Sequence, residues 1–343
     1  MNHSDRYFFP PEWHPHEATW FTWPHNRDTW PTYLNDVQEA LIRVISYISE
    51  VENVHIAVND KETLQVLTDR FSNFSNHEKI FIHLIESNDA WARDHGALFV
   101  FDKSANRLAL NFKYNAWGGK YPPFDKDNQI PLRMSEIFNA EVIHYDYVLE
   151  GGALDFNGAG LLLSTTECLL NSNRNGDHSK GSVQKYLSEI FEIDEIIWLE
   201  NGIEGDDTDG HIDEIARFIS DEKIIIMKED HSDHANFKNL KKNYQNLKES
   251  DLAKIKNIEV ISLKMPQTIY DPNVGVLPAS YANFYFANEI LLFPQFGCKA
   301  DSYNIGILRE HIQDRDIIPF ASNALVQGLG GLHCLTQQIP KSN

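Results

Sequence analysis

The chain has 343 residues, 42% of them hydrophobic, which is enough to bury the core of one large domain or of two ordinary ones. Its formal net charge of −20 argues against nucleic acid as a partner and favours a small cationic one. Three cysteines, far apart and odd in number, exclude a disulfide framework, and the lack of a signal-like start or of a run of about 20 apolar residues predicts a cytoplasmic protein without a membrane span.

The first 80 residues alternate between strand-like and helix-like patterns. The tryptophan-rich stretch 18–23 predicts a strand, whose aromatic side chains suit a core or a pocket wall. Apolar residues recur on one helical face between Pro31 and Glu50 and predict a helix there. A strand at 54–58 and a short helix at 62–71 follow, so the chain begins as a mixture of strands and helices.

From residue 80 onward, a loose repeat recurs in five copies, each with an apolar strand, a polar turn and a second apolar strand. The copies begin with strands at 80–85, 142–145, 195–199, 259–263 and 316–320. Helices are predicted in the intervals, at 132–138, 181–191, 235–255 and 302–312. The last copy ends in a glycine loop, and the strand at 18–23 can complete it and close a ring. The pattern predicts one α/β domain, 1–343, built as a propeller-like array, although another α/β layering fits as well.

The polar turns of the copies contain residues that can perform chemistry. Asp94 lies in the first, Glu150 in the second, His211 and Asp213 in the third and Cys334 in the fifth. Equivalent turns of a pseudosymmetric ring meet near its axis. We therefore expect these five side chains to share one pocket.

Spacing selects among neighbouring side chains in these turns. His211 and Asp213 are two residues apart and face the same side if the chain is extended, whereas Glu214 then faces the other way. By the same reasoning, His95 and His333 point away from the pocket. We therefore do not expect His333 to be the base that serves the neighbouring cysteine.

The glycine loop 328–331 precedes Cys334, whose thiol can face a pocket from a rigid backbone at the start of a strand. Most free cysteines are small buried hydrophobes, and Cys168 and Cys298, in unremarkable surroundings, are interpreted in that way. Cys334 is the predicted nucleophile because of its setting and its companions.

A cysteine, a histidine and three carboxylates, without a phosphate-binding glycine loop, suit a guanidinium substrate. Two carboxylates can clamp this planar cation, and a thiolate can attack its carbon. Cys334, His211 and Asp213 could instead hold zinc in a hydrolase, but no HExxH or CxxC pair occurs and the carboxylates are in excess. A guanidine-binding protein without activity is a third reading, against which the complete set of chemical residues argues. We predict neither a metal nor a cofactor.

The chain resembles the agmatine deiminases, which belong with arginine and peptidyl-arginine deiminases to the guanidine-modifying pentein superfamily. The resemblance extends over nearly the whole chain and is carried by five motifs: EATW at 17–20, NDAWARDHG at 88–96, EGG at 150–152, GDDTDGHID at 205–213 and GGLHCLTQQ at 330–338. It implies a five-bladed α/β propeller, which agrees with the repeat, and a homodimer.

The resemblance also implies a role for each chemical residue. Asp94 and Asp213 grip the guanidinium, while Glu150 hydrogen-bonds it and orients His211. The histidine serves as general acid and base, and Cys334 forms a covalent thiouronium that water resolves.

The resemblance further implies that Trp91 packs along the alkyl chain of the substrate. At its far end, Asp206 and Asp207 are expected to bind a terminal ammonium, which favours agmatine and N-carbamoylputrescine as substrate and product, although each carboxylate is as well suited to capping its turn. Free-arginine or peptidyl-arginine deimination by the same chemistry is the alternative. Members of the family often have asparagine where this chain has Asp209 and Glu214, so the distal contact stays open.

Overall fold

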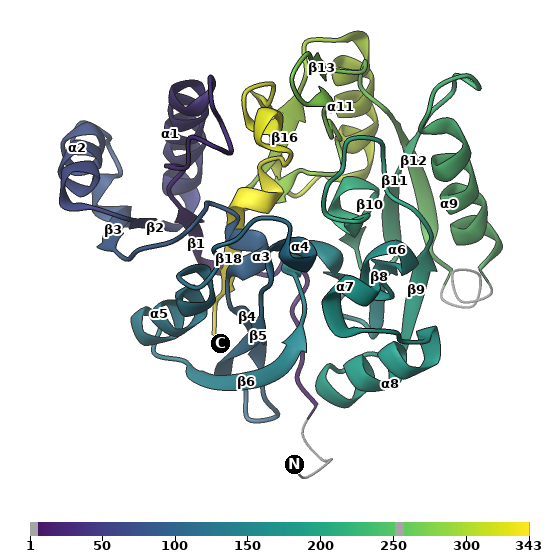
Figure 1. Ribbon diagram of the computed structural model, residues 1–343, viewed down its shortest axis with the longest axis horizontal. Coiled ribbons are helices and arrows are strands. Elements are labelled where there is room, and N and C mark those ends of the chain that lie inside the picture. The colour runs from purple at the N-terminus through teal and green to yellow at the C-terminus, as the bar shows by residue number, and fades with distance from the viewer. Residues whose placement is uncertain (1–5, 251–256, 343) are drawn as a thin grey trace.

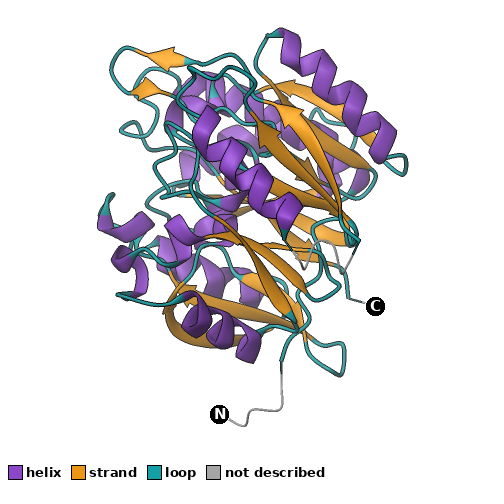
Figure 2. Ribbon diagram, turned by 90° about the vertical axis from the view of Figure 1, so that its right-hand side faces the viewer, coloured by secondary structure: helices purple, strands orange, loops and turns teal. Residues whose placement is uncertain are grey.

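Five small β-sheets with helices around them form the fold, in a computed structural model that describes residues 6–250 and 257–342 (Figures 1 and 2). In the four sheets that follow the first along the chain, the first two strands are antiparallel and the third runs parallel to the second. The recurrence predicted from the sequence is therefore present in the strand pairing.

The first sheet has the order β18 (Thr336–Pro340), β1 (His16–Thr22), β2 (Asn53–Val58) and β3 (Ile80–Leu84). The second contains β4 (Leu98–Phe101), β5 (Arg107–Lys113) and β6 (Glu141–Val148), and the third β7 (Asp155–Phe156), β8 (Leu161–Thr165) and β9 (Glu195–Leu199). The fourth contains β10 (Ala216–Ser220), β11 (Lys223–Lys228) and β12 (Glu259–Lys264), and the fifth β15 (Tyr285–Phe286), β16 (Ile290–Gln295) and β17 (Asp316–Ala321). A hairpin of β13 (Tyr270–Asp271) and β14 (Gly275–Val276) stands apart from them.

The two ends of the chain meet in the first sheet. Strand β18 pairs antiparallel with β1, with Ala18 opposite Ile339, and both side chains are fully buried (Figure 1). This pairing confirms the expectation that the tryptophan-rich strand completes the last copy. It places the glycine loop before β18 next to the strands that begin the chain.

The predicted helices are found within a few residues of their expected limits. They are α1 (Leu34–Val51), α2 (Lys61–Phe71), α5 (Ile130–Ile137), α8 (Lys180–Ile190), α9 (Phe237–Glu249) and α11 (Lys299–His311). Part of the predicted helix at 235–255 lies outside the described residues. The start of α2 is fixed by Asp60, whose carboxylate accepts the Thr63 N–H at 2.7 Å. No helix in the described ranges is long and apolar enough to cross a membrane.

The predicted repeat unit spans two neighbouring sheets. Its first strand is the last strand of one sheet, as in β3, and the following turn leads into the next sheet. The short strands β7 and β15 were missed because each has two residues and shows no alternation of polar and apolar side chains. The five-residue β10 was also missed, so the predicted second strands fell on β8, β11 and β16.

Candidate active site

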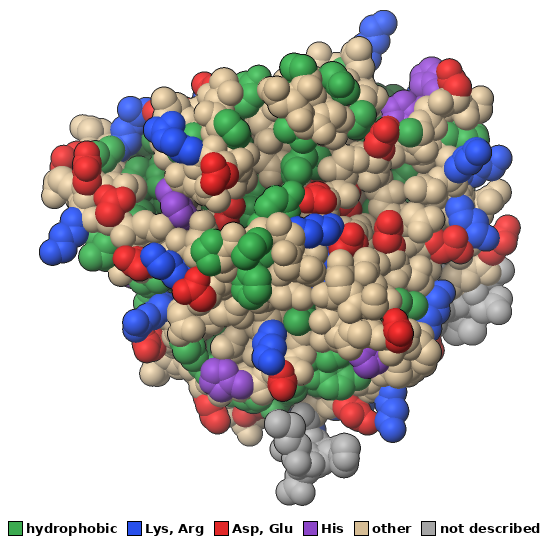
Figure 3. Space-filling view, in the orientation of Figure 1, with side chains coloured by type: hydrophobic (Ala, Val, Ile, Leu, Met, Phe, Trp, Pro, Cys, Tyr) green, Lys and Arg blue, Asp and Glu red, His purple; other side chains and the backbone are tan. Residues whose placement is uncertain are grey.

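A cavity of about 680 Å³ opens over the turns that connect successive sheets. The buried side chains of Asp94 and Cys334 line what is here called its closed end, and Trp91 and Trp117 form part of its wall. The other predicted residues, Glu150, His211 and Asp213, are not among the lining residues. Figure 3 shows acidic and basic side chains together at the centre of this face, where α4 (Ala116–Gly119) lies in Figure 1.

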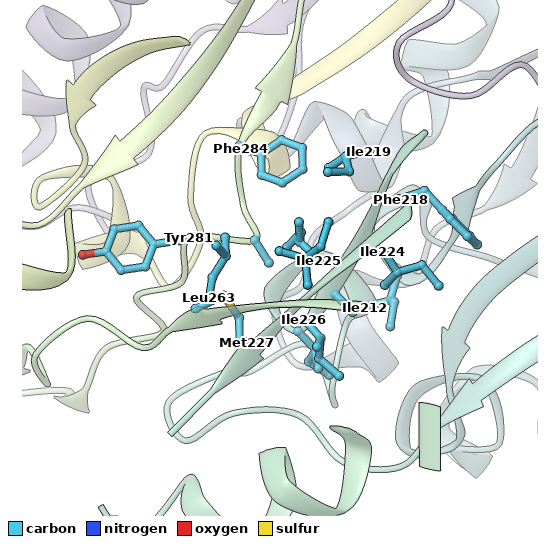
Figure 4. Close-up of a cluster of buried hydrophobic side chains, with 14 of the residues drawn as sticks. Ile212, Phe218, Ile219, Ile224, Ile225, Ile226, Met227, Leu263, Tyr281 and Phe284 are labelled. Atoms are coloured by element: carbon cyan, nitrogen blue, oxygen red, sulfur yellow. The ribbon is translucent and has the colours of Figure 1, made fainter. Parts of the chain in front are cut away.

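The turns that carry the predicted residues are helical rather than extended. Asp94 belongs to the one-turn helix α3 (Ala92–His95), and short 3-10 turns occur at Gly151–Ala153, Ile212–Glu214 and His333–Leu335. Ile212, between His211 and Asp213, is fully buried in the hydrophobic cluster around β10 to β12, which anchors this turn (Figure 4).

The structure brings His211 between two of the predicted carboxylates. Its Nδ1 lies 3.7 Å from Asp94 Oδ1, and its Nε2 lies 3.9 Å from Glu150 Oε2. The approach requires glycine at 152, because a Cβ there would lie 2.5 Å from His211 Nδ1 and 2.8 Å from Asp94 Oδ1. The Glu-Gly-Gly motif thus supplies both a carboxylate and the space beside it.

The other two predicted residues, Cys334 and Asp213, form a second group. Cys334 Sγ lies 3.7 Å from Asp213 Oδ2, and both side chains are buried. Trp91 borders the loop before the cysteine so closely that a Cβ on Gly330 would lie 2.4 Å from the indole. It packs against Trp30 with ring centroids 5.2 Å apart, and Trp91 lines the cavity, whereas the tryptophans of the stretch 18–23 are buried in the core and do not line it.

Two of the buried carboxylates have one oxygen fixed and one free. Glu150 Oε1 accepts Arg174 Nε–H at 2.7 Å, and Asp213 Oδ2 accepts from His333 Nδ1 at 2.7 Å and from Asn283 Nδ2 at 3.3 Å. Within the described residues, Glu150 Oε2 and Asp213 Oδ1 have no hydrogen-bond partner. A buried acceptor without a donor is costly, so these oxygens favour a ligand that brings N–H groups.

Asp94 is oriented by the chain that surrounds it. Its Oδ1 accepts the Gly152 N–H at 2.9 Å, and its Oδ2 accepts the Trp117 indole N–H at 3.0 Å. The Trp117 backbone adopts a left-handed conformation, φ 55°, which is uncommon for a bulky residue. The cavity wall and the carboxylate are thereby fixed to each other.

The electrostatics of the protein groups in the site favour a protonated histidine and a neutral thiol. Burial alone would lower the pKa of His211, but Asp94 and Glu150 contribute to raising it well above its ordinary value. Burial raises the pKa of Cys334 well above its ordinary value, and the charges of Asp213, Glu214 and Asp94 raise it further. A cation that enters between these carboxylates favours the thiolate.

Several residues that build the site were missed by the sequence analysis. His333 does not line the cavity, as expected, but it holds Asp213 through Nδ1 and contacts Glu12 Oε2 through Nε2 at 2.6 Å. Arg174 holds Glu150 from the turn Ser172–Asn175. Nothing in the sequence pairs these residues with their partners, because they lie far apart along the chain. His333 is 120 positions from Asp213 and 321 from Glu12, and Arg174 is 24 from Glu150.

The expectation that Glu214 faces away from the pocket is wrong. The chain forms a 3-10 turn there, so the period of two does not apply. Glu214 Oε1 accepts Asn283 Nδ2–H at 2.9 Å and lies 3.9 Å from Cys334 Sγ. The surroundings of Cys168 are also closer to the chemistry than expected, since its sulfur lies within 4.8 Å of a carboxylate oxygen of Glu150 and a ring nitrogen of His211.

Of the two carboxylates in the acidic loop before His211 that were expected to bind the substrate, only one lines the cavity. The carboxylate of Asp206 accepts the backbone N–H of Thr208 at 2.8 Å and of Gly210 at 2.9 Å. It caps the turn and lines a separate hollow, which corrects the assignment of Asp206 as a substrate contact. Asp207 does line the cavity, where its carboxylate accepts the Tyr121 hydroxyl.

A lysine that the sequence analysis did not single out lies at the same rim. Lys120 Nζ donates to the Asp207 carbonyl at 2.6 Å, contacts its carboxylate at 3.4 Å, and donates to Asp209 Oδ1 at 2.9 Å. The other oxygen of Asp209 pairs with Arg174. The rim, defined here as Lys120, Tyr121, Asp207 and Asp209, is therefore less acidic than the loop sequence suggests.

Comparisons with known proteins give one consistent family. Residues 8–340 match the model of the Porphyromonas-type peptidyl-arginine deiminases. A provisionally named agmatine deiminase of Legionella pneumophila (strain Paris) is 35% identical over 338 residues, which cover 98% of this chain and 96% of that protein. An agmatine deiminase of Stutzerimonas stutzeri is 30% identical over 360 residues, with 98% and 96% covered. The structure of a cysteine-to-serine variant of C. jejuni agmatine deiminase with substrate bound matches with a TM-score of 0.90 at 30% identity, over 98% of this chain and 97% of that one.

Proposed function

The chain belongs to the Porphyromonas-type peptidyl-arginine deiminase family, and on this premise we propose that it hydrolyses agmatine to N-carbamoylputrescine and ammonia. One observation carries the proposal: a buried thiol and Asp94 line the cavity, and beside them the buried Glu150 and Asp213 each keep an acceptor oxygen that has no hydrogen-bond partner among the described residues. Relatives named agmatine deiminase that align over nearly the full length support the choice of substrate.

The free oxygens suit the clamp that a guanidinium needs. Asp213 Oδ1 and Glu150 Oε2 are unpartnered within the described residues, and Asp94 reaches the cavity from the opposite turn. A guanidinium offers its N–H groups in one plane, and carboxylates accept them in pairs. Trp91 then packs along the alkyl chain of the substrate, and Asp207 faces its ammonium at the rim.

The reaction proceeds in two halves. The bound cation favours release of the Cys334 proton to solvent, and the resulting thiolate forms an S–C bond to the guanidinium carbon. The C–N bond to the departing nitrogen breaks, and the His211 imidazolium donates the proton that makes it ammonia. A thiouronium remains on the cysteine.

In the second half, neutral His211 takes a proton from water. The oxygen of that water attacks the thiouronium carbon. The S–C bond then breaks with its electron pair on sulfur, the remaining hydroxyl proton passes to that sulfur, and the ureido product leaves. Glu150 keeps the imidazole oriented in both halves, and Arg174 keeps Glu150 oriented. No step uses a metal or an organic cofactor, so chelator treatment is expected to leave turnover unchanged.

The finer points of architecture are proposals as well. We propose that the five sheets form the five blades of a pentein propeller in one domain, 1–343, since the sheets repeat one pairing pattern and β18 pairs with β1. A homodimer in the cytoplasm remains the expectation from the sequence. Sedimentation of the purified protein would establish the oligomeric state.

Free arginine is the main alternative substrate, and its carboxylate would require an unpaired cation at the rim. Lys120 lies there, but its ammonium is already bound by Asp207 and Asp209, and the other cation of the cavity lining is the exposed, and therefore screened, Arg27. The test compares kcat/KM for agmatine, free arginine and an N-acylated arginine amide under identical conditions. We expect agmatine to be preferred on the order of a hundredfold. Equal or better turnover of either arginine compound would reject agmatine and leave the deiminase chemistry in place.

A further inference from the structure

Glu214 is a carboxyl beside the nucleophile to which the proposed mechanism assigns no role. Its side chain is buried, and its Oε1 lies 3.9 Å from Cys334 Sγ. Among the described residues its Oε2 has no hydrogen-bond partner. Three acceptor atoms lie within 4.8 Å of one another, one each from Asp213, Glu214 and Cys334. Three acidic groups therefore meet at the sulfur.

A single amide serves all three groups. Asn283 Nδ2 lies 2.9 Å from Glu214 Oε1, 3.3 Å from Asp213 Oδ2 and 3.3 Å from Cys334 Sγ. The amide nitrogen has two hydrogens, so it cannot satisfy three anionic acceptors at once. Its Oδ1 accepts the His333 N–H at 2.9 Å, which fixes which end of the amide faces the sulfur. Asp213 Oδ2 also accepts from His333, whereas Glu214 and Cys334 share the neutral amide, so two negative charges at Glu214 and Cys334 oppose each other.

Asp213 is the group that stays ionised. The pKa of Asp213 is lowered, because His333 donates to its Oδ2 and outweighs the cost of burial. Glu214 receives no comparable donor. Burial raises the pKa of Glu214 well above its ordinary value, and the charges of Asp213 and Asp206 raise it further, which outweighs the opposing effects of His211 and of the contact with Cys334. The exchangeable protons of these groups therefore lie on Glu214 and Cys334.

We propose that Glu214 is a specificity-determining residue that shares its ionisation with Cys334, so that the sulfur stays a thiol towards neutral electrophiles and becomes a thiolate when a cation enters the cavity. The proposal rests on the proposed function for the identity of that cation. Two acidic groups this close titrate as a pair, and the first ionisation opposes the second. Glu214 loses its proton first, and its charge then holds the proton on sulfur. A guanidinium between the carboxylates supplies the compensating positive charge, and the proton then leaves the sulfur.

The variant Glu214→Gln tests this directly. Glutamine keeps the shape and an oxygen for Asn283, but it cannot ionise. The matched control is Glu229→Gln, which removes another buried carboxylate, one that accepts the His231 N–H at 2.8 Å and lines a separate hollow. Each protein is treated with neutral iodoacetamide and with cationic 2-chloroacetamidine between pH 6 and 10, and mass spectrometry locates the label on Cys334.

In Glu214→Gln, we expect the pH midpoint for labelling by iodoacetamide to fall by about one unit or more, since a unit charge at this distance in a partly screened site shifts an ionisation by at least that much. The rate of labelling by chloroacetamidine should change less. The ratio of the chloroacetamidine rate to the iodoacetamide rate should therefore fall about tenfold. The control variant should keep the wild-type midpoint and ratio. An unchanged midpoint and ratio in Glu214→Gln would overturn the proposal.

A measurement on the wild-type protein tests the same proposal if the variant fails to fold. Binding of acetamidinium, which lacks the chlorine that chloroacetamidine loses to sulfur, should release about one proton, measured by calorimetry in two buffers of different ionisation enthalpy. Binding without proton release would contradict the proposal. Neither probe contains the agmatine tail. If wild type fails to turn over agmatine while Cys334 is still labelled by chloroacetamidine, the proposed substrate is wrong and the role of Glu214 is tested all the same.

Discussion

The closed end of the cavity and its rim contain the same kind of charge in different settings. Next to the closed end, Asp213 beside Cys334 and Glu150 beside His211 are fully buried, and each has one oxygen held by a buried donor from another part of the chain. At the rim, the Asp207 side chain is 37% exposed and shares Lys120 with its neighbours. A buried charge has no water to replace a lost partner, whereas a rim charge is screened. The same substitution should therefore have very different effects at the two ends.

Loss of the nucleophile should have the largest effect. Cys334→Ala is expected to reduce turnover to the uncatalysed background while agmatine still binds, because the carboxylates at the closed end are intact. The matched control is Cys298→Ala, since Cys298 is a partly exposed thiol that contacts the Tyr281 hydroxyl at 3.3 Å. The measurements are ammonia release and the calorimetric Kd of agmatine. Residual turnover well above background in Cys334→Ala would reject this cysteine as the nucleophile.

Loss of one carboxylate of the clamp should come next. Asp213→Asn removes one charged partner from the guanidinium and leaves His333 with Glu12 alone of its two carboxylates, and breaking a buried ion pair costs about 3–5 kcal/mol. This corresponds to a loss of agmatine affinity of about a hundredfold to several thousandfold. The Kd is best measured with Cys334→Ala in both proteins, so that no adduct forms. Wild-type affinity in the asparagine variant would show that the clamp lies elsewhere.

A smaller loss of activity is expected on substitution of Arg174, which acts through Glu150. Arg174 donates to Glu150 through Nε at 2.7 Å and to the Thr208 carbonyl through Nη2 at 2.7 Å, and it also binds Asp209. Lysine keeps the charge but cannot span these partners. A lost charged hydrogen bond costs about 1.5–3 kcal/mol, so Arg174→Lys should lower kcat/KM by about ten- to a hundredfold.

The pH profile separates this role from a loss of stability. The pKa of Glu150 is lowered in spite of burial, because His211 and Arg174 favour its charged form. Activity that needs the carboxylate is present above that pKa and is lost as the pH falls through it. Arg174→Gln weakens the support, so the acid limb of kcat/KM should move to higher pH. An unchanged acid limb, with lower activity at every pH, would indicate a structural role only.

The sequence predicts those site residues that can be recognised from the turn in which they lie. Asp94, Glu150, His211 and Cys334 were found because each lies in a polar turn between apolar strands, and β-strand pairing brings these turns together. Arg174 escaped notice because its partner is chosen by the folded chain, not by its neighbours in sequence.

Local geometry limited the rest of the prediction. Glu214 was assigned to the wrong side because a 3-10 turn replaces an extended chain. Asp206 was counted as a substrate contact because sequence shows a carboxylate but not the backbone N–H groups that it caps. The same limit applies to Lys120, which is distant in sequence from the acidic loop that it partly neutralises.

The smallest effect is expected at the rim. Asp207→Asn removes a carboxylate that is partly exposed and already engaged by Tyr121 and Lys120. Exposed ion pairs contribute about 0–1 kcal/mol, so the KM for agmatine should rise no more than about fivefold, with kcat unchanged. Because salt screens exposed charges, the difference from wild type should shrink further between low salt and about 0.5 M NaCl. Free arginine should gain relative to agmatine, since the variant repels its carboxylate less. A rise in KM as large as the loss of affinity in Asp213→Asn would mean that Asp207 is desolvated when substrate binds, and the rim would then belong with the closed end.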